Sequence, residues 1–169
     1  MLINIFIKVL TKSEEVVAMK VDSVDFAIYL NKRAKENKKN YFINETKIQK
    51  WMYICYGLCL AKDKEKLLDE PPLAGEHGPV FKKVLRAYVG SEEFPNVVEP
   101  KIIDDVKKRI DSFIDPVLEH FGQWTPAELV AWTMKSGGAW EDAYARIGKD
   151  AVLPDSRVQD EFNMFVKNK

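Results

Sequence analysis

The sequence predicts a mainly α-helical fold, a single globular domain of six to eight helices with a small two- or three-stranded β element. Three observations lead to this prediction. Apolar residues recur every three or four positions in several segments, which is the spacing of one helix face. Capping residues or prolines precede several of these segments. The intervening stretches, such as 71–79, are short and rich in proline and glycine, which leaves room only for brief strands.

The composition is that of one folded domain without a charge bias. The 169 residues are 46% apolar and 31% charged, as in globular rather than disordered chains. The 26 basic residues equal the 26 acidic residues in number, so the basic field typical of nucleic-acid-binding proteins is absent and a nucleic-acid partner is disfavoured. No apolar run reaches the roughly 18 residues of a membrane span. We therefore expect a cytoplasmic protein without a membrane partner.

Residues 1–20 are expected to form an N-terminal arm outside the helical domain at 21–169. Large aliphatic residues crowd the first ten positions, which predicts a short strand or a docked segment. Met19 directly precedes what resembles a natural domain start. Translation from Met19 and an additional edge element at the N-terminus are two open alternatives.

Two helices are expected at the start of the domain. The first begins at 22–23 and runs into the basic segment 32–39, whose cations suit the negative end of a helix dipole. The second covers about 46–62, with Thr46 and Gln49 at the spacing of a capping box. Its apolar stripe is nearly unbroken, which predicts a buried central helix. The stripe consists of Ile48, Trp51, Met52, Cys55, Leu58 and Cys59.

Proline and glycine separate this central helix from the next one. Residues 73–76 are expected to form a short strand, and residues 97–98 a second strand that can pair with it. Gly78 and Pro79 mark a turn, and Pro79 suits the first position of the following helix. Gly90 is placed to end that helix.

A long helix is predicted over 103–121, and a shorter one follows it. Pro116 lies inside the long helix, so we expect a kink or a break near 113–115. The segment 125–128 is the strongest helix start in the chain, with threonine as the cap, proline at the first position and glutamate at the third.

Two more helices complete the predicted domain. Residues 140–147 form a short helix after the glycine pair at 137–138, and Gly148 can end it. The last helix begins at Ser156, with Gln159 at the capping-box position. Its inward-facing residues are expected to be Val158, Phe162, Phe165 and Val166.

The residues that commonly carry chemistry form no catalytic or metal-binding motif. Cys55 and Cys59 share a face of the central helix, which favours two buried thiols over a zinc site with His77 and His120. Glu76 and His77 are the best acid–base pair, but no nucleophile accompanies them. We therefore expect no catalytic residue, no metal and no cofactor.

Two sequence features suggest a binding surface. The segment 32–39 has five basic residues and one acidic residue and is a candidate for phosphate contacts, although the zero net charge favours a solvated helix end. Trp124, Trp132 and Trp140 lie close together in sequence and are expected mainly in the core. Trp140 follows two glycines and is the better interface candidate.

Three ordered segments carry a resemblance to a known family. Residues 46–58 are similar to a Leu-x-Lys-Leu-x-Tyr-type central helix, residues 72–80 to an Ala-Trp-x-x-Gly-Pro-Val motif, and residues 128–143 to a Leu-Ser-x-x-Thr-His…Pro-Trp segment. Together they resemble the Panacea (SocA-like) antitoxin domain, often phage-associated, from about residue 24 to the end. The residues quoted for the first two motifs are Thr46, Gln49, Trp51, Tyr53, Gly78, Pro79 and Val80. The chain has Gly75, Met134 and Ala139 in place of a motif Trp, His and Pro.

The resemblance implies a non-catalytic antitoxin-like protein. Members of the family bind and neutralise a protein toxin encoded beside them, and at least one relative hands its toxin to a protease. A cognate toxin is therefore the expected partner, and a protease is the second partner if this chain is also an adaptor. The expected contact residues are His77, Phe81, Arg86, Tyr88 and Trp140.

Two other classes of function remain open from the sequence. A helical domain with a small β-ribbon can imitate a winged helix, so a DNA-binding regulatory protein is the main alternative. An enzyme that uses His77 is the second alternative.

Overall fold

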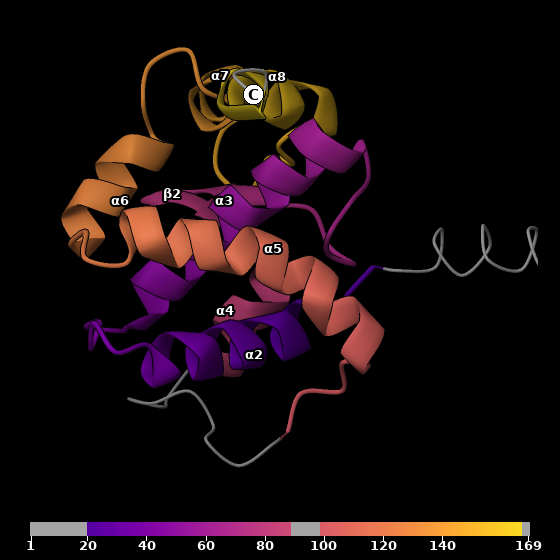
Figure 1. Ribbon diagram of the computed structural model, residues 1–169. Coiled ribbons are helices and arrows are strands. Elements are labelled where there is room, and N and C mark those ends of the chain that lie inside the picture. The colour runs from indigo at the N-terminus through magenta and orange to yellow at the C-terminus, as the bar shows by residue number, and fades with distance from the viewer. Residues whose placement is uncertain (1–19, 89–98, 167–169) are drawn as a thin grey trace, which may run out of the picture.

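The computed structural model describes residues 20–88 and 99–166 (Figure 1). These residues form seven helices and one two-stranded antiparallel sheet, which confirms the predicted mainly α fold with a small β element. The N-terminal arm, apart from Lys20, the strand at 97–98 and the Gly90 cap lie outside the described residues. No helix within the described ranges is both long and apolar enough to cross a membrane.

Helix α2 (Ser23–Glu36) begins where the sequence predicts it to begin. The carboxylate of Asp22 caps it by accepting from the backbone N–H groups of Val24 and Asp25 at 2.9 and 3.0 Å. The helix ends within the basic segment, so its final turn carries Arg33 and Lys35 near the negative end of the dipole.

Helix α3 (Glu45–Asp63) occupies the centre of the domain and packs against α2, α4, α5, α6, α8 and β2. Its cap is Asn44, whose side chain accepts from the N–H of Lys47 at 3.0 Å. The predicted capping box of Thr46 and Gln49 is therefore wrong: the helix starts earlier, and Gln49 is free to bond elsewhere. Every residue from 47 to 61 except Leu58 is buried.

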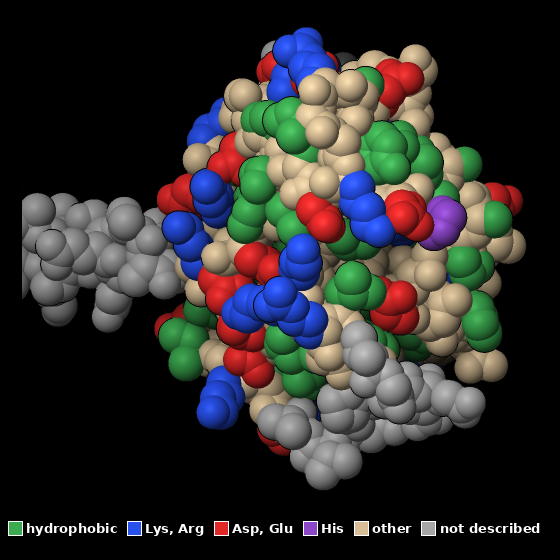
Figure 2. Space-filling model, turned by 180° about the vertical axis from the view of Figure 1, so that it is seen from behind, with side chains coloured by type: hydrophobic (Ala, Val, Ile, Leu, Met, Phe, Trp, Pro, Cys, Tyr) green, Lys and Arg blue, Asp and Glu red, His purple; other side chains and the backbone are tan. Residues whose placement is uncertain are grey.

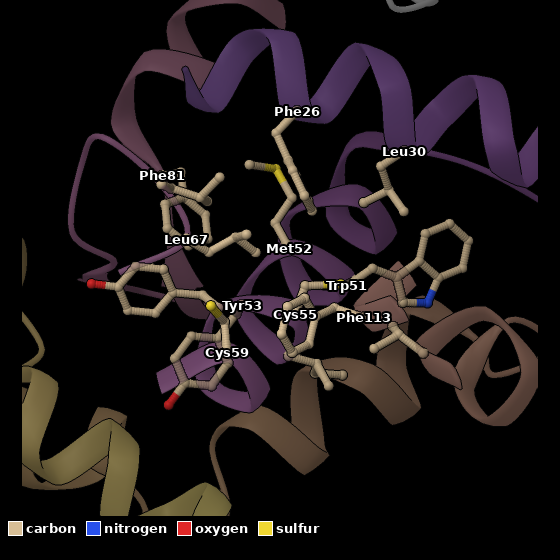
Figure 3. Packing of buried hydrophobic residues seen from close by; sticks show 14 of the residues in the cluster. Phe26, Leu30, Trp51, Met52, Tyr53, Cys55, Cys59, Leu67, Phe81 and Phe113 are labelled. Atoms are coloured by element: carbon tan, nitrogen blue, oxygen red, sulfur yellow. The ribbon is translucent and has the colours of Figure 1, made fainter. Parts of the chain in front are cut away.

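The hydrophobic core is built around α3. Figure 3 shows its side chains at the centre of the cluster, with Phe26 and Leu30 of α2 on one side and Phe113 of α5 on another. Trp51 and Tyr53 are fully buried. Burying a large apolar side chain contributes about 1.5–3 kcal/mol, so this cluster is the main source of stability.

Helix α8 (Asp155–Val166) lies directly against α3. A Cβ on Gly57 would lie 2.2 Å from the Phe162 ring, so the absence of a side chain lets the two helices approach closely. The helix begins before Ser156, and Pro154 accepts from the N–H of Val158 at 3.0 Å. The predicted Ser156 capping box is thus wrong.

The inward face of α8 is narrower than expected. Val158 and Phe162 are buried, as predicted, but Phe165 is half exposed and Val166 only partly buried. One buried carboxylate, Glu161, accepts from the hydroxyl of Tyr53 at 2.8 Å and from the N–H of Ala139 at 3.0 Å. It thereby joins α8 to the central helix and to the start of α7.

Helix α5 (Asp104–Phe121) continues through Pro116, so of the two expected alternatives, a kink or a break near 113–115, the break does not occur. Pro116 is exposed, whereas Phe113, Ile114 and Val117 are buried against the core. Packing on both sides of the proline holds the helix together despite the missing N–H group.

The remaining helices are short. Helix α6 (Pro126–Thr133) has the predicted capping box: Glu128 N–H donates to Thr125 Oγ1 at 3.2 Å, and Thr125 N–H donates to Glu128 Oε2 at 2.7 Å. Helix α7 (Ala139–Arg146) follows the glycine pair. Between α3 and α5 lie β1 (Leu73–Gly75), β2 (Gly78–Val80) and α4 (Lys82–Tyr88).

Candidate functional site

The hairpin formed by β1 and β2 contains the Gly-Pro-Val segment of the resemblance. Gly75 pairs with Gly78, so Glu76 and His77 form a two-residue turn. The φ of Gly78 is +95°, in the left-handed region that favours glycine. A Cβ at this position would also lie 2.8 Å from Thr133 Oγ1. Gly78 therefore shapes the turn, as the sequence predicts.

Pro79 lies within β2 and does not begin a helix, so its predicted position is wrong. Opposite it, Ala74 uses both backbone groups elsewhere: its N–H donates to Ala151 at 2.8 Å, and its carbonyl accepts from Asp150 at 2.9 Å. The N–H that proline lacks is therefore not needed for pairing with β1. The carbonyl of Pro79 accepts from Lys50 Nζ at 3.0 Å.

Gln49 attaches the end of the hairpin to the central helix. Its Oε1 accepts from the N–H of Phe81 at 2.8 Å, and its Nε2 donates to the carbonyl of Phe81 at 3.2 Å. Both residues are almost fully buried. An unpaired buried backbone group costs about 1–3 kcal/mol, so this amide fixes the position at which β2 leads into α4.

The other side of the hairpin is held by the segment that follows α7. Leu73 bridges to Val152 in antiparallel fashion, which adds a third extended segment beside β1. The indole N–H of Trp140 donates to the carbonyl of Gly75 at 2.8 Å. Trp140 is only 9% exposed, so its prediction as an exposed interface residue is wrong: it supports the hairpin from within.

A pocket of about 260 Å³ lies beneath the hairpin. The start of α3, the turn, α4 and the loop after α7 all contribute to its walls. It is lined by Glu45, Thr46, Gln49, Lys50, Gly75, Glu76, His77, Val80, Leu85, Lys149 and Asp150. Val80 and Leu85 provide an apolar wall, while the exposed rim residues are mostly charged.

The charges at the rim are largely paired. Lys149 Nζ lies 2.7 Å from Glu76 Oε1, and this bond holds the pKa of Glu76 below its usual value. Asp150 lies 3.6 Å from Lys82 Nζ. Deeper in the site, burial lowers the pKa of Lys50 to about 8, an effect that Glu45 partly opposes.

The five predicted contact residues divide into exposed and buried ones. His77 is exposed at the turn, and Arg86 is exposed on α4. Tyr88 is partly buried at the end of α4, and burial together with the charge of Glu45 raises its pKa. Phe81, like Trp140, is buried and therefore serves the interior of the site. A partner can reach His77 and Arg86 directly.

The residues quoted for the central-helix motif are structural. The indole N–H of Trp51 donates to the carbonyl of Phe121 at 3.3 Å, and Tyr53 binds Glu161 as described above. Thr46 lines the pocket and does not cap the helix.

Sequence reasoning missed Lys47 and Lys50, which are each only 2% exposed. Lys47 Nζ donates to the carbonyl of Gly122 at 2.7 Å and lies 4.8 Å from the centroid of the Trp51 ring. Burial lowers the pKa of both lysines. The sequence could have predicted their burial, because a central helix that is apolar over much of its girth has little exposed surface left for its lysines.

The two cysteines are free and buried. Burial raises the pKa of Cys55 far above its usual value and that of Cys59 to about 12, so neither thiol is ready to form the thiolate that binds zinc. Among the described residues, no group of three or more histidine, cysteine or acidic side chains is arranged to hold a metal.

The basic segment 32–39 faces acidic residues near or on α5. Lys32 lies 3.4 Å from Glu99, Lys39 lies 2.8 Å from Glu119, and Arg33 pairs with Asp115. Seen from the side opposite to the view of Figure 1, Figure 2 shows acidic and basic side chains interspersed among apolar ones. This distribution differs from the continuous basic surface of a phosphate-binding protein.

Comparisons of the chain with family models, with curated proteins and with solved structures found no match. The likeness to the antitoxin family therefore depends on the three motif segments alone.

Proposed function

We propose that this protein is a non-catalytic antitoxin that binds and neutralises a cognate protein toxin through the surface around its hairpin. The observation that carries this proposal is the convergence of the three motif segments. They are far apart in sequence, yet Lys50 from the first contacts Pro79 from the second at 3.0 Å, and Trp140 from the third contacts Gly75 at 2.8 Å.

This convergence supports a preorganised binding surface. Lys50 and Trp140 hold the hairpin by hydrogen bonds to its backbone, and Gln49 holds the backbone of Phe81 directly after it. The side chains of the turn are left available to solvent. A rigid surface loses less conformational entropy when a partner binds than a flexible loop does.

The hairpin surface is defined here as His77, Leu85, Arg86 and the Glu76–Lys149 pair. It combines an exposed apolar residue, an arginine and paired charges, the mixture from which a few anchor residues usually provide most of the binding energy. A stable complex buries roughly 1,200–2,000 Å² in total, so neighbouring residues must contribute as well.

The test is colony survival with the adjacent gene expressed alone and then together with this protein. We expect killing by the neighbour, rescue by this chain, and co-purification of the two proteins. The double variant His77→Glu/Arg86→Glu should fold normally, lose rescue and retain at least tenfold less toxin on an affinity column. The control is Lys108→Glu, because Lys108 is also exposed but lies on α5.

Each other outcome has a defined meaning. A harmless neighbour, or killing without rescue, contradicts the toxin-binding proposal and favours the alternative of DNA binding. That alternative is tested by measuring whether the protein binds DNA in a salt-dependent manner that requires residues 32–39. Full rescue by the double variant places the interface elsewhere. Toxin levels during rescue address the adaptor role: a toxin that disappears indicates delivery to a protease, whereas one that accumulates indicates a neutral complex.

A further inference from the structure

The pocket beneath the hairpin contains an amine that the fold shields from water. Lys50 is 2% exposed and lines the pocket. Its Nζ donates to one acceptor within the described ranges, the neutral carbonyl of Pro79, and forms no ion pair with a carboxylate there. An ammonium group has three N–H donors, so a buried one with a single neutral partner is poorly stabilised.

Two other lysines provide a comparison within the same molecule. Lys47 is equally buried, but it does not line the pocket, and Gly122 and the Trp51 ring surround its ammonium group. Lys149 lines the pocket at its exposed rim, where it is paired with Glu76. Lys50 alone among these three combines burial with contact to the pocket.

We propose that Lys50 is a covalent capture site for small carbonyl compounds, which enter the pocket beneath the hairpin and condense with its amine to an imine. The neutral Nζ attacks the carbonyl carbon and forms the new C–N bond. The C–O bond then breaks, and the oxygen leaves as water with the two amine protons, so the step needs no oxidant or reductant.

The electrostatics of the site favour this reaction. A neutral amine is the nucleophile, and desolvation is a known way to generate one near neutral pH. With a pKa of about 8, roughly a quarter of Lys50 is neutral at about pH 7.5, compared with about 0.1% of an ordinary exposed lysine. The charged groups facing the pocket are Glu45, Glu76, Lys149 and Asp150, and His77 is a further titratable group. Of these, Glu45 partly opposes the lowering of the Lys50 pKa.

The experiment is competitive reductive alkylation of the full chain. Acetaldehyde and sodium cyanoborohydride are added at about pH 7.5, where the hydride reduces the imine to a stable ethylamine, and peptide mass mapping at low conversion gives the rate at each lysine. We expect Lys50 to react at least tenfold faster than Lys149, and Lys47 to stay unmodified. The ratio of the Lys50 rate to the Lys149 rate should fall as the pH rises from about 8 to 10, because Lys149 continues to gain neutral amine while Lys50 is already mostly neutral.

Two results would overturn the proposal. Equal rates at Lys50 and Lys149 would mean that the pocket confers no reactivity, and equal rates at Lys50 and Lys47 would mean that local opening, not the pocket, exposes both amines. Leu85→Trp narrows the pocket without touching the amine and should slow Lys50 alone. An unchanged rate in that variant would show that the carbonyl compound does not enter by this route. None of these measurements depends on the toxin.

Discussion

The two halves of helix α3 are buried to the same degree but use different chemistry. The first half contains Lys47, Gln49 and Lys50, each hydrogen-bonded to the backbone of another segment. The second half packs mainly by apolar contact, with Gly57 facing the Phe162 ring, and Tyr56 adds one hydrogen bond to Asp155 at 2.7 Å. Most residues between 47 and 61 are buried in both halves, so burial alone does not distinguish them.

The difference shows that one half of the helix mainly fixes the position of neighbouring segments, whereas the other half mainly contributes free energy of folding. A buried hydrogen bond contributes only about 0.5–1.5 kcal/mol net, but leaving its partners unpaired is costly, so such bonds select one arrangement of the segments they join. Apolar contact contributes more free energy and selects geometry less strictly. The polar half of α3 adjoins the hairpin and the pocket, so its hydrogen bonds fix the position of the proposed binding surface.

The largest expected effect is in the apolar half. Gly57→Ala places a methyl group 2.2–2.6 Å from atoms of the Phe162 ring, and we expect the free energy of unfolding to fall by about 3 kcal/mol, the upper end of typical overpacking costs. Chemical denaturation measures this. Phe162→Leu in the same chain should restore part of the loss, and a strictly additive double variant would show that the ring is not the obstacle.

Removing one hydrogen bond from the polar half should lower the free energy of unfolding less than Gly57→Ala does. Gln49→Ala leaves the N–H and the carbonyl of Phe81 without their partner, and we expect a loss of about 2 kcal/mol. Gln123→Ala is the matched control, because the exposed Gln123 amide also donates to a backbone carbonyl, that of Lys39. Its loss should be under about 0.5 kcal/mol. Equal losses in the free energy of unfolding would show that burial does not strengthen the hydrogen bonds of a side-chain amide.

Burial of Lys50 in the polar half should make the free energy of unfolding depend on pH. Its pKa is about 8 in the folded chain and about 10.4 when unfolded. Between these two pH values the unfolded chain binds more protons than the folded chain. The free energy of unfolding therefore rises with pH, by up to about 1.4 kcal/mol per pH unit from Lys50, and below about pH 8 the destabilisation by the buried charge is complete. Because tyrosines in the unfolded chain also titrate near pH 10, the measurement is the difference between the wild type and Lys50→Met from pH 7 to 10. A constant difference would contradict the lowered pKa.

The smallest expected effect lies at the rim of the pocket. Lys149→Ala removes the ion pair with Glu76, in which both side chains are 58% exposed. Exposed pairs contribute little because water and salt screen them, so we expect the melting temperature to change by less than about 1 °C. A larger drop would show that the rim, and not only the polar half of α3, holds the hairpin in place.

The predictions that succeeded depend on neighbours in sequence. The capping box at Thr125 and Glu128 involves residues three apart, and the start of α2 is one side chain bonding to the next turn. The two capping boxes that failed, at Thr46 and Ser156, are local errors in placing a helix start. Other predictions failed because of distant segments. Pro79 satisfies the local rule for a helix start, yet pairing with β1 and the bond from Lys50 place it in a strand.

The sequence by itself determined that the domain is mainly helical, with α3 as a buried centre, because the period of apolar residues is set by the geometry of the helix and needs no tertiary information. Only the tertiary structure decided which polar side chains enter that centre, that Trp140 supports the hairpin from inside, and that a pocket forms beside Lys50. The physical reason is that a buried polar group needs its partner, and each partner here comes from a segment far along the chain.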